Sequence, residues 1–397
     1  MIGTQEKRDL IFWSIADCNR RIGAAGAAGG LTDQEGGWQP AAGYQPAPHR
    51  DTVTGMRVLI ILSMAALSIA AAPKSLFYLG NDASGRTSFL AHASKIDILV
   101  PTWYRTAVDG AVTGGPVEEI MTAAREHHVP VMPIVVNPGF DLSSFHHLLG
   151  DSAARSKMIG ALIDECHKHG FIGIQFDFEH IADTDRDALS RLVREAADAL
   201  HKEKLQLSIA TVPNAPGHPG TGAFSKWIFE YWRNVYDLKA IGEAVDLVCL
   251  MTYDEHTRYT PPGPVAGYLW TLENLEYALQ FVPKEKLSLG IPVYGYRWYA
   301  GAVAADDKPN PALVTVGGDD VASLIREFHP KIEWDKVDLA SWFWFYRDQT
   351  REWVFYTDVR TFRERYNLAR TRGLQGFCSW VLGREDPGIW NLLPAHR

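Results

Sequence analysis

The sequence predicts an α/β fold, a (β/α)8 TIM barrel with a small α+β insertion after its seventh strand. Eight short apolar runs alternate with amphipathic stretches after Pro73, and continuous apolar runs are typical of parallel strands buried on both faces. No GxGxxG follows the first run, which weakens the dinucleotide-binding alternative. Eight strand–helix units in about 300 residues favour a closed barrel over an open doubly wound sheet.

The expected elements can be placed directly on the chain. The predicted strands are 76–80, 96–104, 130–136, 172–179, 205–212, 245–254, 287–294 and 376–382. The clearest amphipathic stretches, which predict helices, are 117–128, 153–169, 185–204, 226–243, 271–281 and 359–372.

One connection is too long for an ordinary barrel loop. Between residue 294 and the helix at 359 lie two β-rich runs, 342–347 and 351–356. They flank Asp348-Gln349-Thr350 and predict a β-hairpin. We therefore expect the α+β insertion at about 299–356.

The N-terminal part divides into two segments of different character. Residues 1–55 carry Gly/Ala repeats and several prolines without an apolar period, which predicts a disordered extension or one that is not translated. Residues 56–72 begin with Met-Arg, continue with an apolar run and end in three alanines, the three parts of a signal peptide. We expect the barrel over 73–397, secreted or in the periplasm or cell envelope. The alternative is a membrane anchor at 58–72.

Composition excludes several classes of protein. Hydrophobic residues make up 46% of the chain and charged residues 22%, which are ordinary values for a globular domain. The net charge of −8 excludes the basic surface of a nucleic-acid binder. The four cysteines are too few and too far apart for a disulfide scaffold, and no CxxC indicates a zinc site. The surplus of aromatic residues hints at a stacking surface, although packing accounts for some of it.

Polar side chains gather at the carboxyl ends of the predicted strands, where barrel enzymes hold their active sites. In the fourth strand, alternation places Gln175, Asp177 and Glu179 on the inward face. Carboxylates at i and i+2 repel, so one tends to keep a proton at neutral pH, as a general acid requires. A lone D-x-E would more simply satisfy a helix cap or an arginine. The aromatic residues and a Tyr-Asp pair (253–254) on neighbouring strand ends favour the catalytic interpretation.

Other chemistry-bearing residues give weaker signals. The histidines at 127–128, 146–147 and 167–169 lie away from strand ends and form no HExxH, so we expect solvated or helix-capping side chains. GxSxG is absent, which leaves a serine hydrolase without its nucleophile. Cys249 and Cys378 are expected to be thiols of the barrel core.

Four motifs resemble glycoside hydrolase family 18, the chitinase family, in the order of its strands. The run FIGIQFDFE (171–179) resembles the family's fourth-strand pattern DGxDxDxE, and MTYD (251–254) resembles its sixth-strand MxYD. GIPVY (290–294) is similar to its seventh strand. The run SWVLGREDPGIW (379–390) contains the eighth-strand Trp and is most similar to the bacterial spore-cortex-lytic and chitobiase-like branch. The resemblance extends from about residue 76 to residue 390.

Two positions depart from the fourth-strand pattern. The first Asp of the pattern is Ile172 here, and its middle Asp is Gln175. In the family the middle acid contacts the catalytic Asp. Gln175 can still donate a hydrogen bond to Asp177, but it cannot carry negative charge, which would alter the pH profile or slow the enzyme.

The resemblance implies retaining hydrolysis in which the N-acetyl carbonyl of the substrate is the nucleophile. It makes Glu179 the general acid and base. It makes Asp177 the residue that orients the acetamido group, and Tyr253 a donor to that group. The implied substrate contacts are Gln175, Asp254, Met251, Tyr294, Trp380 and Trp103. This mechanism needs no metal and no cofactor.

The function implied by the resemblance is cleavage of β-1,4 bonds next to N-acetylglucosamine, in chitin oligosaccharides or peptidoglycan, by a monomeric exported glycosidase. The branch similarity favours peptidoglycan or short oligosaccharides. The alternative is a catalytically silent, lectin-like member of the same fold that binds carbohydrate. Glu179 discriminates between the two, because silent members usually lose this acid and this chain retains it.

Overall fold

The computed structural model describes residues 72–299 and 312–395. The predicted extension at 1–55 and nearly all of the predicted signal peptide at 56–72 lie outside these ranges. Within them, no helix is both long enough and apolar enough to cross a membrane.

Eight parallel strands form the barrel. In chain order they are β1 (Lys74–Leu79), β2 (Ile98–Pro101), β5 (Ile134–Val136), β6 (Gly173–Asp177), β7 (Gln206–Thr211), β8 (Leu247–Leu250), β9 (Leu287–Pro292) and β15 (Gly376–Trp380). Their order in the sheet is β2-β1-β15-β9-β8-β7-β6-β5. A parallel bridge between Leu99 and Val131 joins β2 to the segment just before β5 and closes the ring. The predicted barrel is therefore confirmed.

A short hairpin extends the barrel beside the second strand. Its strands are β3 (Tyr104–Thr106) and β4 (Val112–Gly114). β3 pairs in parallel with β5 and antiparallel with β4. The chain of the second barrel strand thus continues past Pro101 and brings Trp103 and Arg105 to the carboxyl end of the barrel.

Most of the predicted helices are present. α2 (Glu118–Glu126), α4 (Ser152–His169), α5 (Arg186–Lys202), α8 (Tyr268–Ala278) and α10 (Val359–Arg372) follow the expected stretches. α1 (Ala83–His92), α3 (Leu142–Gly150) and α9 (Gly318–Phe328) were not expected from the sequence. α1 buries only Gly85 and Phe89, so it lacks the apolar stripe that would have revealed it.

The predicted helix 226–243 is wrong as a single element. The chain forms α6 (Ala223–Ile228), a π-helical turn (Phe229–Arg233) and α7 (Leu238–Ala244) instead. Tyr236 interrupts the helix because it is buried and donates its O–H to Phe178 O at 2.6 Å. Asp237 then starts α7 by accepting a hydrogen bond from Ala240 N–H.

The barrel interior is closely packed at β8 and β9. A Cβ on Gly290 would lie 2.4 Å from the carbonyl oxygen of Leu250. A side chain at this position would therefore push the two strands apart, which explains a glycine in the middle of a buried strand.

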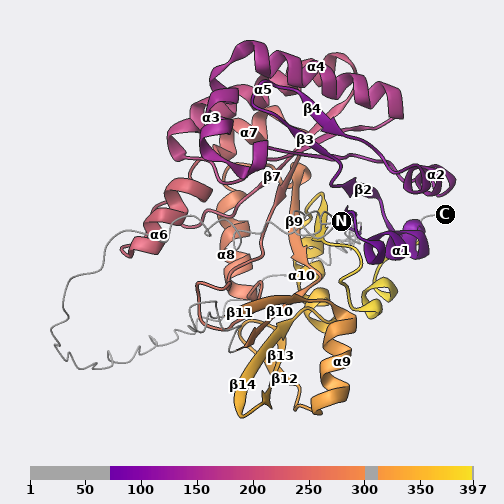
Figure 1. Ribbon diagram of the computed structural model, residues 1–397, viewed down its shortest axis with the longest axis vertical. Coiled ribbons are helices and arrows are strands. Elements are labelled where there is room, and N and C mark those ends of the chain that lie inside the picture. The colour runs from indigo at the N-terminus through magenta and orange to yellow at the C-terminus, as the bar shows by residue number, and fades with distance from the viewer. Residues whose placement is uncertain (1–71, 300–311, 396–397) are drawn as a thin grey trace, which may run out of the picture. The chain divides into compact units, whose positions relative to one another are not determined.

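The insertion after the seventh strand is a second, antiparallel sheet with one helix. Its strand order is β11 (Ala312–Val316), β10 (Gly295–Tyr299), β14 (Thr350–Tyr356), β13 (Ala340–Arg347) and β12 (Glu333–Asp335). In Figure 1 these strands and α9 are the orange elements gathered beside one another. In chain order the first of these strands is β10, which follows the barrel strand β9 after two intervening residues. The insertion therefore begins slightly before the predicted start at about 299.

The expected hairpin of the insertion is formed by β13 and β14. Its turn residues Asp348 and Gln349 have φ of 49° and 62°, the left-handed conformation that a two-residue hairpin turn requires. α9 covers one face of this sheet, where Val321 and Leu324 pack with Phe343, Phe345 and Val354.

Candidate active site

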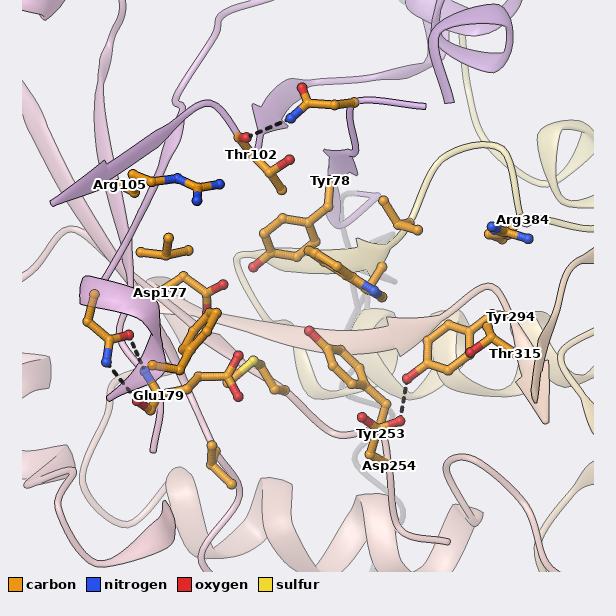
Figure 2. A pocket seen from close by; sticks show the side chains of 18 of the residues that line it. Tyr78, Thr102, Arg105, Asp177, Glu179, Tyr253, Asp254, Tyr294, Thr315 and Arg384 are labelled. Carbon is orange, nitrogen blue, oxygen red and sulfur yellow. Dashed lines mark hydrogen bonds between the residues drawn. The ribbon is translucent and has the colours of Figure 1, made fainter. Parts of the chain in front are cut away.

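A cavity opens at the carboxyl ends of the barrel strands. Its volume is about 380 Å³, within the range of small-ligand sites. Strands β2, β6, β8, β9 and β15 contribute to its wall through their carboxyl ends or the residues that follow them, and so does the insertion. Figure 2 shows these side chains pointing into one space.

The cavity brings together all but one of the site residues predicted from the sequence. The predicted residues in its lining are Asp177, Glu179, Tyr253, Asp254, Met251, Tyr294, Trp380 and Trp103. They come from five different strand ends, so the barrel alone explains why residues so far apart in the chain meet here.

The exception is Gln175, which lies below the cavity. Its side chain is fully buried, and its Nε2 donates to Ser208 Oγ at 2.8 Å and to Cys249 Sγ at 3.3 Å. Both amide hydrogens are therefore engaged, and the expected hydrogen bond from Gln175 to Asp177 is not formed. Cys249 and Cys378 are buried free thiols at this level of the barrel.

The carboxyl groups of Asp177 and Glu179 are the central titratable pair. Burial raises the pKa of Asp177 to about 7. Burial also raises the pKa of Glu179 well above its usual range, and the neighbouring carboxylates Asp177 and Asp254 raise it further. Among the described residues, Asp177 Oδ1 has no hydrogen-bond partner. All of these causes act in the same direction, so the pair keeps a proton at neutral pH.

The backbone of Glu179 is held from two sides by Asn137, which follows β5. Asn137 Nδ2 donates to Glu179 O at 2.9 Å, and Glu179 N–H donates to Asn137 Oδ1 at 3.1 Å. Both bonds appear as dashed lines beside Glu179 in Figure 2. Because β6 ends at Asp177, these contacts fix a residue that the sheet itself no longer holds. Sequence reasoning missed Asn137, although its position directly after a strand was a signal.

Asp254 has a different environment at the end of the β8 segment. Its Oδ1 accepts from Tyr294 Oη at 2.5 Å and from Tyr296 Oη at 2.6 Å. Burial raises its pKa, but these two hydrogen bonds favour the charged form and oppose the shift. Its φ of 62° lies in the left-handed region, which aspartate tolerates better than most residues. Tyr296, on the inserted strand β10, was not predicted.

Aromatic rings surround the carboxyl groups. Trp380 lies 5.3 Å from Tyr78 between ring centroids, and Tyr253 meets Tyr294 edge to face at 6.4 Å. Burial and nearby carboxylates raise the pKa of Tyr253 well above its usual range. Tyr253 therefore keeps its O–H and can donate a hydrogen bond into the cavity.

Three arginines in the lining were also missed. Arg105, Arg258 and Arg384 contribute to the cavity wall, and Figure 2 shows Arg105 and Arg384 on opposite sides of it. Among the described residues, no group of three or more His, Cys, Asp or Glu side chains is placed to hold a metal ion. The exposed His146 contacts the buried Asp185 at 2.7 Å, and the exposed His167 contacts Glu203 at 3.2 Å.

Comparisons with known proteins agree with this geometry. The sequence profile of glycosyl hydrolases family 18 matches residues 74–385. The cortical fragment-lytic enzyme of Bacillus subtilis (strain 168) is 28% identical over 294 residues, 72% of this chain and 64% of that protein. This chain therefore spans less than two thirds of that relative's length.

Two solved structures share the fold over most of the described chain. The crystal structure of a chitinase from Chromobacterium violaceum matches with a TM-score of 0.71 at 26% identity, covering 81% of this chain and 97% of that one. The spore cortex-lytic enzyme of Bacillus cereus matches with a TM-score of 0.71 at 25% identity, covering 81% and 73%.

Proposed function

The chain belongs to glycosyl hydrolase family 18, and from this premise we propose that it cleaves β-1,4 bonds next to N-acetylglucosamine with retention of configuration. The observation that carries the proposal is the buried pair Asp177 and Glu179, in a cavity that also contains Tyr253 and Trp380. The burial of both carboxyl groups supports one protonated acid beside one carboxylate at neutral pH.

In this mechanism Glu179 moves the proton. It protonates the glycosidic oxygen as the bond to the anomeric carbon breaks, and it later removes a proton from the attacking water. A carboxyl with an ordinary pKa would have lost its proton near pH 7. The raised pKa of Glu179 therefore supports its role as the acid.

The nucleophile in the proposal belongs to the substrate. The acetamido carbonyl oxygen attacks the anomeric carbon as the leaving oxygen departs, and it forms a cyclic oxazolinium ion. Asp177 accepts a hydrogen bond from the acetamido N–H and stabilises the positive charge, while Tyr253 donates its O–H to the same group. Water then opens the ring, takes the place of the leaving group and gives its proton to Glu179.

The position of the two carboxyl groups supports this assignment over inversion. Inverting enzymes place their carboxylates about 6.5–9.5 Å apart, with a water on the opposite face of the sugar. Asp177 is two residues from Glu179, roughly 6.5–7 Å along an extended chain, so spacing alone does not decide. Both side chains project from the same wall, however, where Asp177 is unable to activate a water on the far side of the ring.

Binding of the sugar is assigned to the aromatic and acidic residues around the pair. We place Trp380 under the sugar ring and Asp254 in contact with its distorted form. Asp254 suits this role because two tyrosine hydroxyls fix its carboxylate. The hydrolysed glycan in this proposal is a chitin oligosaccharide or a peptidoglycan fragment. Among the similar proteins, one is named a chitinase and another a cortical fragment-lytic enzyme.

The test of the proposal is Glu179→Gln, which keeps the shape of the side chain but removes the transferable proton. We expect hydrolysis of a fluorogenic N-acetylglucosamine oligomer to fall by about 10²–10⁴-fold, while binding of the same oligomer survives. More than a tenth of the wild-type rate would remove Glu179 from the acid role. A wild-type protein that binds but does not hydrolyse would support the lectin-like alternative.

We also propose that the protein is exported through the segment at 56–72, because this segment has the three parts of a signal peptide.

A further inference from the structure

Arg105 and Asp177 lie on the same face of the barrel sheet, two strands apart. Arg105 of β3 is paired in register with Val136 of β5, and Val136 is paired with Asp177 of β6. All three residues line the cavity. Because neighbouring strands are about 4.8 Å apart, the backbones of Arg105 and Asp177 are roughly 10 Å apart. Arg105 is therefore placed beside the part of the cavity that holds the carboxyl pair.

The hairpin of β3 and β4 holds Arg105 at the cavity. Arg105 is exposed, whereas Tyr104 and Thr106 on either side of it are buried. Gly114 on β4 packs so closely that a Cβ there would lie 1.9 Å from the carbonyl oxygen of Trp103. Figure 2 shows the Arg105 side chain among those that point into the cavity. The backbone that carries this guanidinium is thus held on both sides, by β4 and by β5.

Within residues 72–299 and 312–395, the fold gives Arg105 no hydrogen-bond, ion-pair or ring partner. The other two arginines of the lining differ, because Arg384 lies 3.8 Å from Asp320 and Arg258 is also engaged within the chain. The pKa values of the carboxyl pair are raised by burial and by neighbouring carboxylates, so Arg105 does not set them. The charge of Arg105 is therefore available to a ligand.

A neutral oligosaccharide would leave this charge unused. N-acetylglucosamine is uncharged, whereas the guanidinium group is always protonated and its planar fork matches a carboxylate with two parallel hydrogen bonds. The chain has a net charge of −8, and three carboxyl groups line the cavity. Binding of an acidic ligand here therefore depends on a local positive charge, which Arg105 supplies.

We propose that Arg105 is a specificity residue that binds the carboxylate of an acidic sugar joined to the N-acetylglucosamine in the cavity. This inference rests on the proposed function, because Asp177 orients that N-acetylglucosamine. The offset of two strands leaves room for the guanidinium to reach the next sugar along the chain. In a glycan that alternates N-acetylglucosamine with an acidic sugar, both neighbours carry a carboxylate, so the contact forms in either chain direction.

Two kinds of glycan supply this chemistry. In peptidoglycan the carboxylate lies on an ether substituent of the neighbouring sugar, and in a uronic acid it lies on the sugar ring itself. Chitin oligosaccharides carry no carboxylate. The proposal therefore makes the substrate an acidic, alternating glycan and ranks neutral chitin below it.

The test compares each acidic oligosaccharide with its own methyl ester, which removes the charge and keeps the rest of the molecule. The substrates are a peptide-free peptidoglycan oligosaccharide and an oligosaccharide of alternating N-acetylglucosamine and uronic acid. The variants are Arg105→Gln and Arg105→Lys. The matched control is Arg194→Gln, which makes the same change of charge at an exposed position on α5, outside the cavity lining.

We expect the wild-type protein to have a kcat/KM about three- to tenfold higher for one free acid than for its ester, mainly through KM. Arg105→Gln should bring this ratio to about one, Arg105→Lys should keep part of it, and Arg194→Gln should keep all of it. The ratio should also shrink in about 1 M salt, where charges are screened beyond ~3 Å. Since both substrates meet the same protein, a loss of folded protein does not change the ratio.

Equal rates for acid and ester in the wild-type protein would overturn the proposal, and so would a wild-type ratio in Arg105→Gln. The glycan that shows the ratio identifies the position of the carboxylate. If only neutral chitin oligosaccharides are hydrolysed, the specificity role fails while the proposed function stands. If nothing is hydrolysed, the proposed function fails, and calorimetric Kd values for acid and ester still decide on Arg105.

Discussion

The ends of β6 and β8 both place carboxyl groups in the same cavity, but they treat the charge differently. At β6, Asp177 has one oxygen without a partner among the described residues, and burial raises its pKa to about 7. At β8, Asp254 is also buried, but two tyrosine hydroxyls donate to it and oppose the shift. Burial raises the pKa of both carboxyl groups, and only at Asp254 do hydrogen bonds oppose that rise. The β6 end is suited to chemistry and the β8 end to binding.

The largest difference in activity is expected between the variants Asp177→Asn and Asp254→Asn. We expect Asp177→Asn to lower kcat by about 10²–10⁴-fold, because it loses the charge that stabilises the oxazolinium ion. Asp254→Asn should lower kcat/KM only about tenfold, since its role is to hold the sugar. Steady-state kinetics on a short oligomer measure both. Equal losses in kcat for the two variants would contradict the division of roles.

A second comparison concerns what holds the acid in place. Asn137→Leu removes both backbone hydrogen bonds to Glu179, and we expect kcat to fall by about 10–100-fold with little change in KM, because the carboxyl is misplaced. Tyr236→Phe is the matched control, since it removes a hydrogen bond to Phe178, the preceding residue. It should lower kcat less than threefold. If Asn137→Leu had the same kcat and the same pH profile as the wild-type protein, a positioning role for Asn137 would be excluded.

The third comparison concerns stability, and the size of the expected effect depends on pH. Because the pKa of Asp177 is about 7 in the folded protein and near 4 when unfolded, the folded state binds the proton more tightly. Its contribution to stability is present below pH 4 and is lost as the pH rises toward 7. We expect Asp177→Asn to increase the free energy of unfolding by roughly 2–4 kcal/mol at pH 8 and by little at pH 4.

Urea unfolding at both pH values measures this difference. Asp254→Asn should stabilise less at pH 8, because it also weakens two hydrogen bonds. Stabilisation by Asp177→Asn that is equal at pH 4 and pH 8 would show that relief of the buried charge is not its cause.

The barrel could be predicted largely from the pattern of apolar residues in the sequence. The eight strand runs, Asp177, Glu179 and Tyr253 were found because burial on both faces and position at a strand end are properties of a single segment. The exclusion of GxGxxG and the hairpin at 348–350 are likewise local. The structure contains these locally predicted features because contacts with distant segments do not change them.

What the sequence did not reveal depends on contacts between distant segments. Asn137 is one polar residue in a loop until β5 brings it to Glu179, 42 positions away. Tyr296 belongs to the insertion but reaches Asp254. Gln175 has the correct inward parity, yet Ser208 and Cys249 engage its amide below the cavity. Helix 226–243 breaks because Tyr236 turns inward toward Phe178.

The configuration of the product tests the central claim most directly. If Asp177 and Tyr253 hold the acetamido group as the nucleophile, the first-formed reducing end keeps the β configuration. Proton NMR during the first minutes of hydrolysis of an N-acetylglucosamine oligomer distinguishes the two anomers before they equilibrate. We predict a predominantly β product. A predominantly α product would mean that water attacks directly from the opposite face, which would contradict the substrate-assisted mechanism.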